Sequence, residues 1–389
     1  MRPVEREVLE KTVHCGTELN GYQSYFCPDC GAVHRIRFSC KTRLCGWCGA
    51  KANEKFADGF VRRMLPVTHR HITFTTPREM WPIFHRDPAM QQEMSQAAFR
   101  VIKKAMLLAL GIMLTIGCMN VLHNYGRDLK ENCHTHMIVT EGGMDKEGNW
   151  VRFTYFPFQK EGRIRFTINE LWRDEVLEIL RRHLPNTPWN ARFIEGFRRR
   201  YPNGFYVNSP SKARIKTSKS LKRKAKYITR YVKHPVISDR RLVRYNGKEV
   251  EFWHDHPSTG ERRTIVMSVM QFIKAVLNHI PEKHFRAVAY YGLYSPNFPQ
   301  KVQFQAVFGY DGESVDPFLL SWKERVYLET GHHPSHCGKC GREMVLVAAV
   351  YWKNGDLNPC YYLSFQDRMA IRYPDDEMWL ARARSGLAR

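Results

Sequence analysis

The chain has 389 residues, of which 43% are hydrophobic, and it carries 61 lysines and arginines against 38 acidic residues, a formal charge of +23. This composition indicates a globular protein, and the length favours two or three domains over one. A positive excess of this size is hard to reconcile with any partner except a polyanion, so nucleic acid is the leading candidate and a membrane surface the second.

The N-terminal segment predicts the location of the protein, and the cysteines predict that it binds metal. The first fifteen residues contain no apolar segment of the kind that secretory signals have, so we expect a cytoplasmic, nucleoid-associated protein. The eleven cysteines are then kept reduced, and their pairing along the chain suggests metal binding rather than disulfides.

Two CxxC pairs lie in the N-terminal segment. Cys27 and Cys30 form the first, Cys45 and Cys48 the second, and fourteen residues separate them. Four thiolates at this spacing can meet at one tetrahedral Zn²⁺. The spacing therefore predicts a small zinc-ribbon-like domain over residues 1–65, with Zn²⁺ as its structural cofactor.

The other cysteines leave alternatives open. Cys15 and Cys40 lie in the same segment, where they are either ligands of a second site or buried thiols, which are common in cores. Near the other end, Cys337 and Cys340 make a third CxxC pair inside a C-terminal accessory region, residues 297–389. One such pair is half of a zinc site.

The first elements after the cysteine-rich segment are a strand over residues 69–77 and a helix over 92–110. The apolar run 105–122 that follows is long enough to span a bilayer, but glycines interrupt it, Gly111 among them. We therefore predict the end of a core helix, a glycine turn and a buried strand over 117–126, and no interaction with a membrane.

The remaining elements continue the alternation of strands and helices. The pattern predicts a strand over 151–158, an amphipathic helix over 168–184, strands over 248–256, 262–268 and 285–295, and a helix over 268–280. Strands and helices in this order predict an α+β fold, a palm of antiparallel strands with helices on one face.

Two histidines stand one residue apart in a further predicted strand, "ENCHTHMIVT". Side chains at i and i+2 of a strand share a face, so His134 and His136 would project side by side, as two nitrogen ligands of a metal do. The preceding strand could bring His123 to them as a third ligand, and His71 and Glu141 are its rivals. Taken alone, such a pair is more commonly two histidines that are hydrogen-bonded on a wet face.

Two tyrosines four residues apart follow the most basic stretch of the chain. Eight of the fifteen residues from 212 to 226 are Lys or Arg, without an acid. Tyr227 and Tyr231 would share one face of a helix that Pro235 ends. Such spacing commonly reflects core packing, but a phenol, with a pKa of about 10, becomes a useful nucleophile near cations. We expect the surrounding cations to contact DNA phosphates: Lys222, Arg223, Lys224, Lys226, Arg230 and Lys233.

The order of these motifs resembles the two-tyrosine HUH transposases of rolling-circle insertion sequences, the IS91 type, which are related to Helitron transposases. The resemblance runs from about Cys15 to Ser295 and is carried by the cysteine module, "HITFTTP", "LHNYGRDLKENCHTHMIVTEGG", "KYITRYVKHPVIS" and "HFRAVAYYGLYS". It implies an HUH endonuclease palm over residues 66–296, with the tyrosine helix near 222–234, preceded by a zinc-binding, DNA-positioning domain.

The resemblance also assigns roles. His134 and His136 match the histidines of the HUH motif, His123 matches a recurrent histidine of the preceding strand, and Tyr227 and Tyr231 match the two nucleophiles. In such enzymes a tyrosine attacks the scissile phosphate of single-stranded DNA, keeps the 5′-phosphate and releases a 3′-hydroxyl, with Mg²⁺ or Mn²⁺ as the catalytic ion. The implied partners are single-stranded DNA of the element ends and target, and host replication machinery, because no phosphate-binding GxxxxGKS/T motif is present.

Two other functions fit parts of the same pattern. A rolling-circle plasmid replication initiator or relaxase shares the chemistry but acts in replication or transfer. A non-catalytic zinc-containing DNA-binding protein would use the tyrosines as core and the histidines as a hydrogen-bonded pair.

Overall fold

The computed structural model describes residues 1–65, 67–153, 166–209, 214–215, 223–229, 235–256, 259–298, 327, 333, 335–353 and 356–361. The chain divides into two compact units. Residues 1–6 and 43–314 form the first, which we call the palm unit. Residues 7–42 and 315–389 form the second, which we call the cysteine unit.

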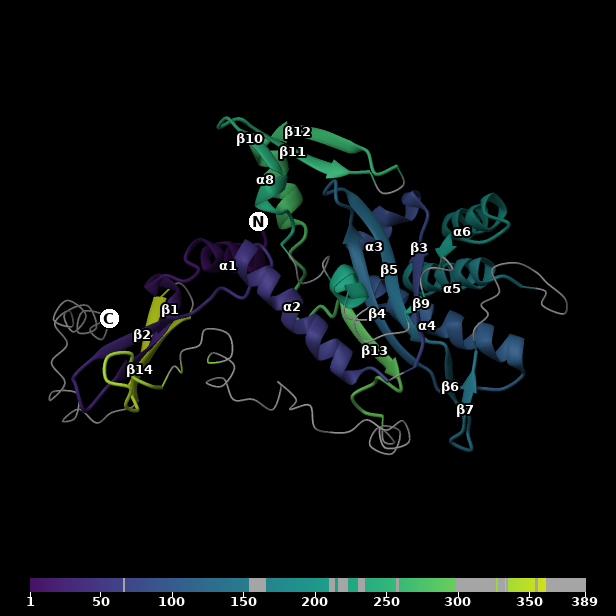
Figure 1. Ribbon diagram of the computed structural model, residues 1–389. Coiled ribbons are helices and arrows are strands. Elements are labelled where there is room, and N and C mark those ends of the chain that lie inside the picture. The colour runs from purple at the N-terminus through teal and green to yellow at the C-terminus, as the bar shows by residue number, and fades with distance from the viewer. Residues whose placement is uncertain are drawn as a thin grey trace. The chain divides into compact units, whose positions relative to one another are not determined.

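The helices and strands of the chain follow in order, coloured from purple to yellow in Figure 1. They are α1 (Pro3–Val13), β1 (Gly21–Phe26), β2 (Val33–Arg37), α2 (Gly46–Arg63), β3 (His69–Thr75), α3 (Trp81–Arg86), α4 (Pro88–Leu110), β4 (Gly117–Tyr125), β5 (Glu131–Thr140), β6 (Gly142–Met144), β7 (Trp150–Arg152), α5 (Ile168–His183), α6 (Pro188–Arg200), β8 (Val207–Asn208), β9 (Arg214–Ile215), β10 (Leu242–Tyr245), β11 (Glu249–Asp255), β12 (Arg262–Ser268), α8 (Val269–Leu277), β13 (Val288–Gly292), β14 (Val345–Lys353) and β15 (Asp356–Tyr361). Residues 223–229 are also helical.

The palm unit is built on an antiparallel sheet with strand order β13-β4-β5-β3-β8, to which β9 adds by pairing with β3. The strand β5 is central, and its neighbours β4 and β3 come from distant parts of the sequence. This arrangement, with helices packed on the sheet, confirms the predicted α+β fold.

Alternation along β5 separates two hydrophobic cores. Cys133, Met137 and Val139 belong to the core formed with α4 and α5, which cover one face of the sheet (Figure 1). Ile138 belongs to a second core that includes residues of α2 and of helix 223–229. Because side chains alternate between faces, the even-numbered histidines of β5 project on the side of α2 and helix 223–229.

The apolar run 105–122 folds as predicted. Helix α4 ends at Leu110, and Gly111 caps it in the left-handed conformation, with φ of +74° and its N–H donating to the Leu107 carbonyl. The buried strand β4 then begins at Gly117. Among the described residues, no helix is long and apolar enough to cross a membrane.

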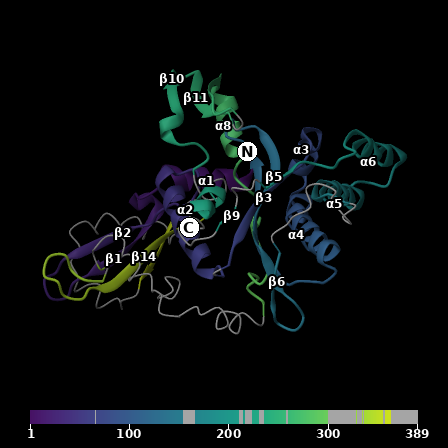
Figure 2. The same ribbon diagram turned by 45° about the vertical axis from the view of Figure 1, so that its right-hand side comes forward.

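A small three-stranded sheet, β10-β11-β12, lies with α8 in the palm unit, and the two views show these elements grouped together (Figures 1 and 2). Ser268 and Gln271 form a capping box that starts α8 directly after β12. The predicted elements 248–256, 262–268 and 268–280 are thereby confirmed. The strand predicted over 151–158 is described only to residue 153, and β7 ends at Arg152.

The cysteine unit is also built on an antiparallel sheet, with order β15-β14-β1-β2. The C-terminal strand β14 pairs with β1 from Gly21↔Tyr351 to Phe26↔Val345. The C-terminal region is therefore part of the N-terminal module, whereas α2 belongs to the palm unit. These units cut across the predicted boundaries 1–65, 66–296 and 297–389, because pairing between strands so far apart in sequence leaves no local signal.

Candidate metal centre and nucleophile

Three histidines meet on the sheet face that carries helix 223–229. His123 comes from β4, and His134 and His136 come from β5. Their ring centroids lie 4.4–5.0 Å apart, and their possible ligand atoms all lie within 4.8 Å of one another. The register explains the meeting, since His123 is the direct cross-strand partner of His134.

Each of the three imidazoles has one ring nitrogen committed to a hydrogen bond. His123 Nε2 donates to the Ile228 carbonyl at 3.0 Å, and His134 Nδ1 donates to the Asn132 carbonyl at 2.7 Å. His136 Nδ1 lies 3.0 Å from Thr73 Oγ1 and 2.9 Å from His71 Nε2. Metal-binding histidines are typically oriented in this way, with the other nitrogen left for the ion.

The electrostatics of the cluster keep the rings neutral. Burial lowers the pKa of His134 to about 4. Burial also lowers the pKa values of His123 and His136 well below the ordinary value, and the neighbouring imidazoles lower them further. Neutral imidazoles have the lone pair that a metal needs. The donor set therefore fits a divalent ion.

The two rival ligands have other roles in the structure. Glu141 is buried, and its Oε1 accepts two hydrogen bonds from Arg70, at 2.9 and 2.7 Å. His71 lies on β3, and its Nε2 is 2.9 Å from His136 Nδ1. The sequence did not single out Thr73, although it occupies the same face of β3 as His71, two residues along the strand.

Tyr227 lies beside this cluster, on helix 223–229. Its ring centroid is 6.3 Å from that of His136 and 6.4 Å from that of His71. The helix is anchored by the hydrogen bond from His123 to Ile228 and by Thr229, whose Oγ1 donates to Asn53 Oδ1 of α2 at 2.6 Å. The tyrosine is 36% exposed, so part of its side chain is accessible to solvent.

Three of the six cations that we expected to contact DNA lie among the described residues. Lys224 Nζ lies 5.3 Å from the ring centroid of Tyr227, Lys226 pairs with Glu54 of α2, and Arg223 is exposed. Tyr231, Lys222, Arg230 and Lys233 lie outside the described residues.

The cysteine unit contains a four-thiol cluster that differs from the predicted one. Cys27 and Cys30 meet Cys337 and Cys340, with Sγ–Sγ distances of 3.5 Å for Cys27–Cys340 and for Cys30–Cys337. The prediction that Cys27 and Cys30 share one Zn²⁺ with the next CxxC pair is therefore wrong. The CxxC spacing identifies pairs of potential zinc ligands. It does not show which two of the three pairs share one ion.

The two knuckles of this cluster are alike. Gly31 N–H donates to the Cys27 carbonyl at 2.9 Å, and Gly341 N–H donates to the Cys337 carbonyl at 2.8 Å. Both glycines have φ above +70°, which a residue with a Cβ rarely adopts. Backbone N–H groups lower the pKa of Cys337 to about 7, which favours a thiolate. The donor set and the twin turns fit a tetrahedral Zn²⁺.

The four remaining N-terminal cysteines are divided between the two units. Cys45 and Cys48 lie at the start of α2 in the palm unit. In the cysteine unit, the Cys40 amide donates to Cys15 Sγ at 3.3 Å.

The chain is similar to known transposases over most of its length. Residues 117–301 match the family model described as a putative transposase, and residues 1–76 match a transposase zinc-binding domain. A transposase for insertion sequence element IS801 from Pseudomonas savastanoi pv. phaseolicola is 28% identical over 365 residues, 90% of this chain and 85% of that protein. A putative transposase, y4qJ, from Sinorhizobium fredii is 23% identical over 366 residues, 89% of each chain. No solved structure matches significantly.

Proposed function

Because this chain belongs to the IS91-type transposases with an N-terminal zinc-binding domain, we propose that it cuts and rejoins single-stranded DNA through 5′-phosphotyrosine intermediates in rolling-circle-type transposition. The observation that carries the proposal is the position of Tyr227. Its helix is fixed to His123 through the Ile228 carbonyl, so the phenol and the three-histidine cluster belong to one site.

The proposed reaction is a phosphoryl transfer that conserves the phosphodiester bond energy. The Tyr227 oxygen forms a bond to the scissile phosphorus and loses its proton, and the bond from phosphorus to the 3′-oxygen breaks. The leaving oxygen takes up a proton as a 3′-hydroxyl. Lys224, whose Nζ lies 5.3 Å from the centroid of the tyrosine ring, would attract the phosphate. Rejoining reverses these steps and needs no nucleotide cofactor.

His123, His134 and His136 are the residues that would hold Mg²⁺ or Mn²⁺ in this site. When bound, the ion would withdraw charge from a non-bridging phosphate oxygen. The chain itself orients the three rings through the partners of their other nitrogens, and it holds Tyr227 on the same side of the sheet.

Covalent capture of DNA tests the proposal directly. The full-length protein is incubated with single-stranded oligonucleotides from the element ends and Mn²⁺ or Mg²⁺, and the products are separated on denaturing gels. We expect a protein–DNA species that survives denaturation and requires the ion. If the protein retards DNA on native gels but yields neither cleavage nor adduct with any divalent ion, the non-catalytic alternative is correct.

The cluster of Cys27, Cys30, Cys337 and Cys340 makes a prediction about zinc. Replacing Cys337 by serine should lower the zinc content, measured by elemental analysis of the purified protein, by one equivalent per chain. The matched control is Cys118→Ala, a buried cysteine of the palm core, which should keep its zinc. Unchanged zinc in Cys337→Ser would contradict this assignment.

Four N-terminal cysteines remain for a second site. The matched zinc-binding domain, residues 1–76, contains Cys15, Cys40, Cys45 and Cys48, and we expect them to bind a further Zn²⁺. The zinc that remains in Cys337→Ser should then be about one equivalent.

The hydrogen bond between Thr73 Oγ1 and His136 Nδ1 leads to a prediction about metal affinity. Thr73→Val removes the hydroxyl that orients His136 and should raise the Mn²⁺ concentration for half-maximal cleavage about 10-fold, in the ~10–100-fold range typical of such partners. Thr75→Val is the control, because Thr75 Oγ1 donates to the Tyr206 carbonyl instead. Equal Mn²⁺ requirements in the two variants would exclude the orienting role.

A further inference from the structure

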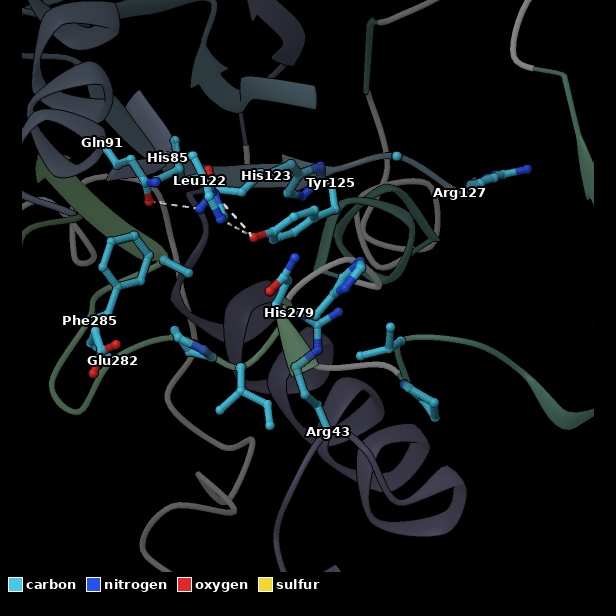
Figure 3. Close-up of a pocket in the computed structure, with 18 of the residues that line it drawn as sticks. Arg43, His85, Gln91, Leu122, His123, Tyr125, Arg127, His279, Glu282 and Phe285 are labelled. Carbon is cyan, nitrogen blue, oxygen red and sulfur yellow. Dashed lines mark hydrogen bonds between the residues drawn. The ribbon is translucent and has the colours of Figure 1, made fainter. Parts of the chain in front are cut away.

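A cavity lies in the palm unit directly beside the histidine cluster. Its volume is about 710 Å³, within the ~300–1,000 Å³ typical of sites for small molecules. His123 forms part of its wall together with residues of β4, β11 and the segment that follows α8 (Figure 3). The cavity therefore adjoins the place where the scissile phosphate would bind, and we call it the arginine cavity.

The wall of the arginine cavity has a strong positive charge. Its acidic residues, Asp255 and Glu282, already form ion pairs, with Arg262 at 3.4 Å and with Arg2 at 2.5 Å. The charge of the lining favours an anionic occupant. The six arginines of the wall are Arg2, Arg43, Arg86, Arg127, Arg240 and Arg241.

Arg43 is the arginine best placed to bind that anion. Its Nε is buried, and among the described residues it has no hydrogen-bond partner. A buried donor of this kind is costly unless a ligand satisfies it. Burial lowers the pKa of Arg43 to about 10, so the guanidinium is still charged at neutral pH. Figure 3 shows its side chain directed toward His279.

An uncharged aromatic platform lies in the same cavity. The rings of Tyr125 and His279 lie 4.2 Å apart with an interplanar angle of 33°, and the Tyr125 hydroxyl hydrogen-bonds to His85 (Figure 3). Burial lowers the pKa of His279 to about 3 and lowers that of His85, so both rings are neutral. Aromatic surfaces next to a phosphate-binding cation are typical of sites for unpaired nucleotides.

We propose that the arginine cavity binds one nucleotide of the single-stranded substrate adjacent to the scissile phosphate, with Arg43 on its phosphate and Tyr125 and His279 against its base. The proposal rests on the proposed function for the identity of the substrate, and it adds a specificity site to it. A phosphate alone would use only the arginine, whereas a nucleotide uses the arginine and the aromatic rings.

Competition binding tests the proposal without any chemistry. A fluorescent single-stranded oligonucleotide is bound to the full-length protein in EDTA, and the 5′-phosphorylated dinucleotide of thymidine displaces it. Arg43→Gln should weaken displacement by the dinucleotide about 10-fold, and Arg43→Lys should weaken it less. The control is Arg192→Gln, an exposed arginine of α6, which should match the wild type. Thermal unfolding of each variant verifies that it is folded.

Three outcomes would overturn the proposal: equal displacement in Arg43→Gln and Arg192→Gln, inorganic phosphate competing as well as the dinucleotide, or free ATP competing better than any DNA fragment. The last two would indicate an anion site or an effector site. Covalent capture with the same proteins distinguishes failure of the nucleotide site from failure of the cleavage mechanism. Wild-type adducts without dinucleotide competition would refute the nucleotide site alone, and the reverse result would refute the cleavage mechanism alone.

Discussion

Replacing Tyr227 and Tyr231 together by phenylalanine is expected to lower cleavage of single-stranded DNA by at least ~10³-fold and to abolish the covalent protein–DNA species. The change removes only the phenolic oxygens. Because Tyr227 is 36% exposed and the ring is retained, the fold should be preserved, and thermal unfolding of the variant verifies it. Single-turnover cleavage rates and covalent capture measure the effect.

The control for the double variant replaces two other tyrosines, both of which are exposed. Tyr206 and Tyr245 are 62% and 68% exposed, and Tyr206→Phe with Tyr245→Phe should cleave at the wild-type rate. The single variants Tyr227→Phe and Tyr231→Phe then divide the effect between the two positions. Wild-type cleavage by the double variant at Tyr227 and Tyr231 would rule out tyrosine as the nucleophile.

Replacing His136 by alanine is expected to lower metal-dependent cleavage by at least ~100-fold. The loss should exceed the ~10–100-fold effect of removing a group that only orients a ligand, because one of three ligands is lost outright. Titration calorimetry with Mn²⁺ should show a matching loss of affinity, whereas DNA binding in EDTA should stay within about twofold of the wild type.

The control for His136 is His254, a half-buried histidine in the small β10-β11-β12 sheet. His254→Ala should keep both the Mn²⁺ affinity and the cleavage rate. If His136→Ala bound Mn²⁺ as tightly as His254→Ala, the three histidines could not be the ligands of a metal.

Local patterns predicted the elements of this protein better than their assembly. The change from helix to strand across Gly111 could be predicted because a glycine cap and the two hydrophobic periods are encoded within a few residues. The partnership of β1 with β14 could not, because more than three hundred residues separate Gly21 from Tyr351. The same pairing determines that Cys27 and Cys30 meet Cys337 and Cys340.

The candidate site, too, could be predicted only where the signal is local in the sequence. Alternation along β5 was enough to place His134 beside His136, but the choice among the three candidate third ligands depends on the register between strands. The register places His123 directly across from His134, whereas His71 Nε2 lies 2.9 Å from His136 Nδ1. Arg43 was beyond sequence reasoning, since nothing distinguishes it among 61 lysines and arginines.

Peptide mapping of the covalent species tests most directly whether Tyr227 or Tyr231 attacks the phosphate. Trypsin cuts after Lys226, Arg230 and Lys233, so Tyr227 falls in the peptide YITR and Tyr231 in YVK. After nuclease trimming, mass spectrometry should find a nucleotide joined through its 5′-phosphate to one of these two peptides. A nucleotide on any other peptide, or cleaved DNA without a modified peptide, would contradict the mechanism.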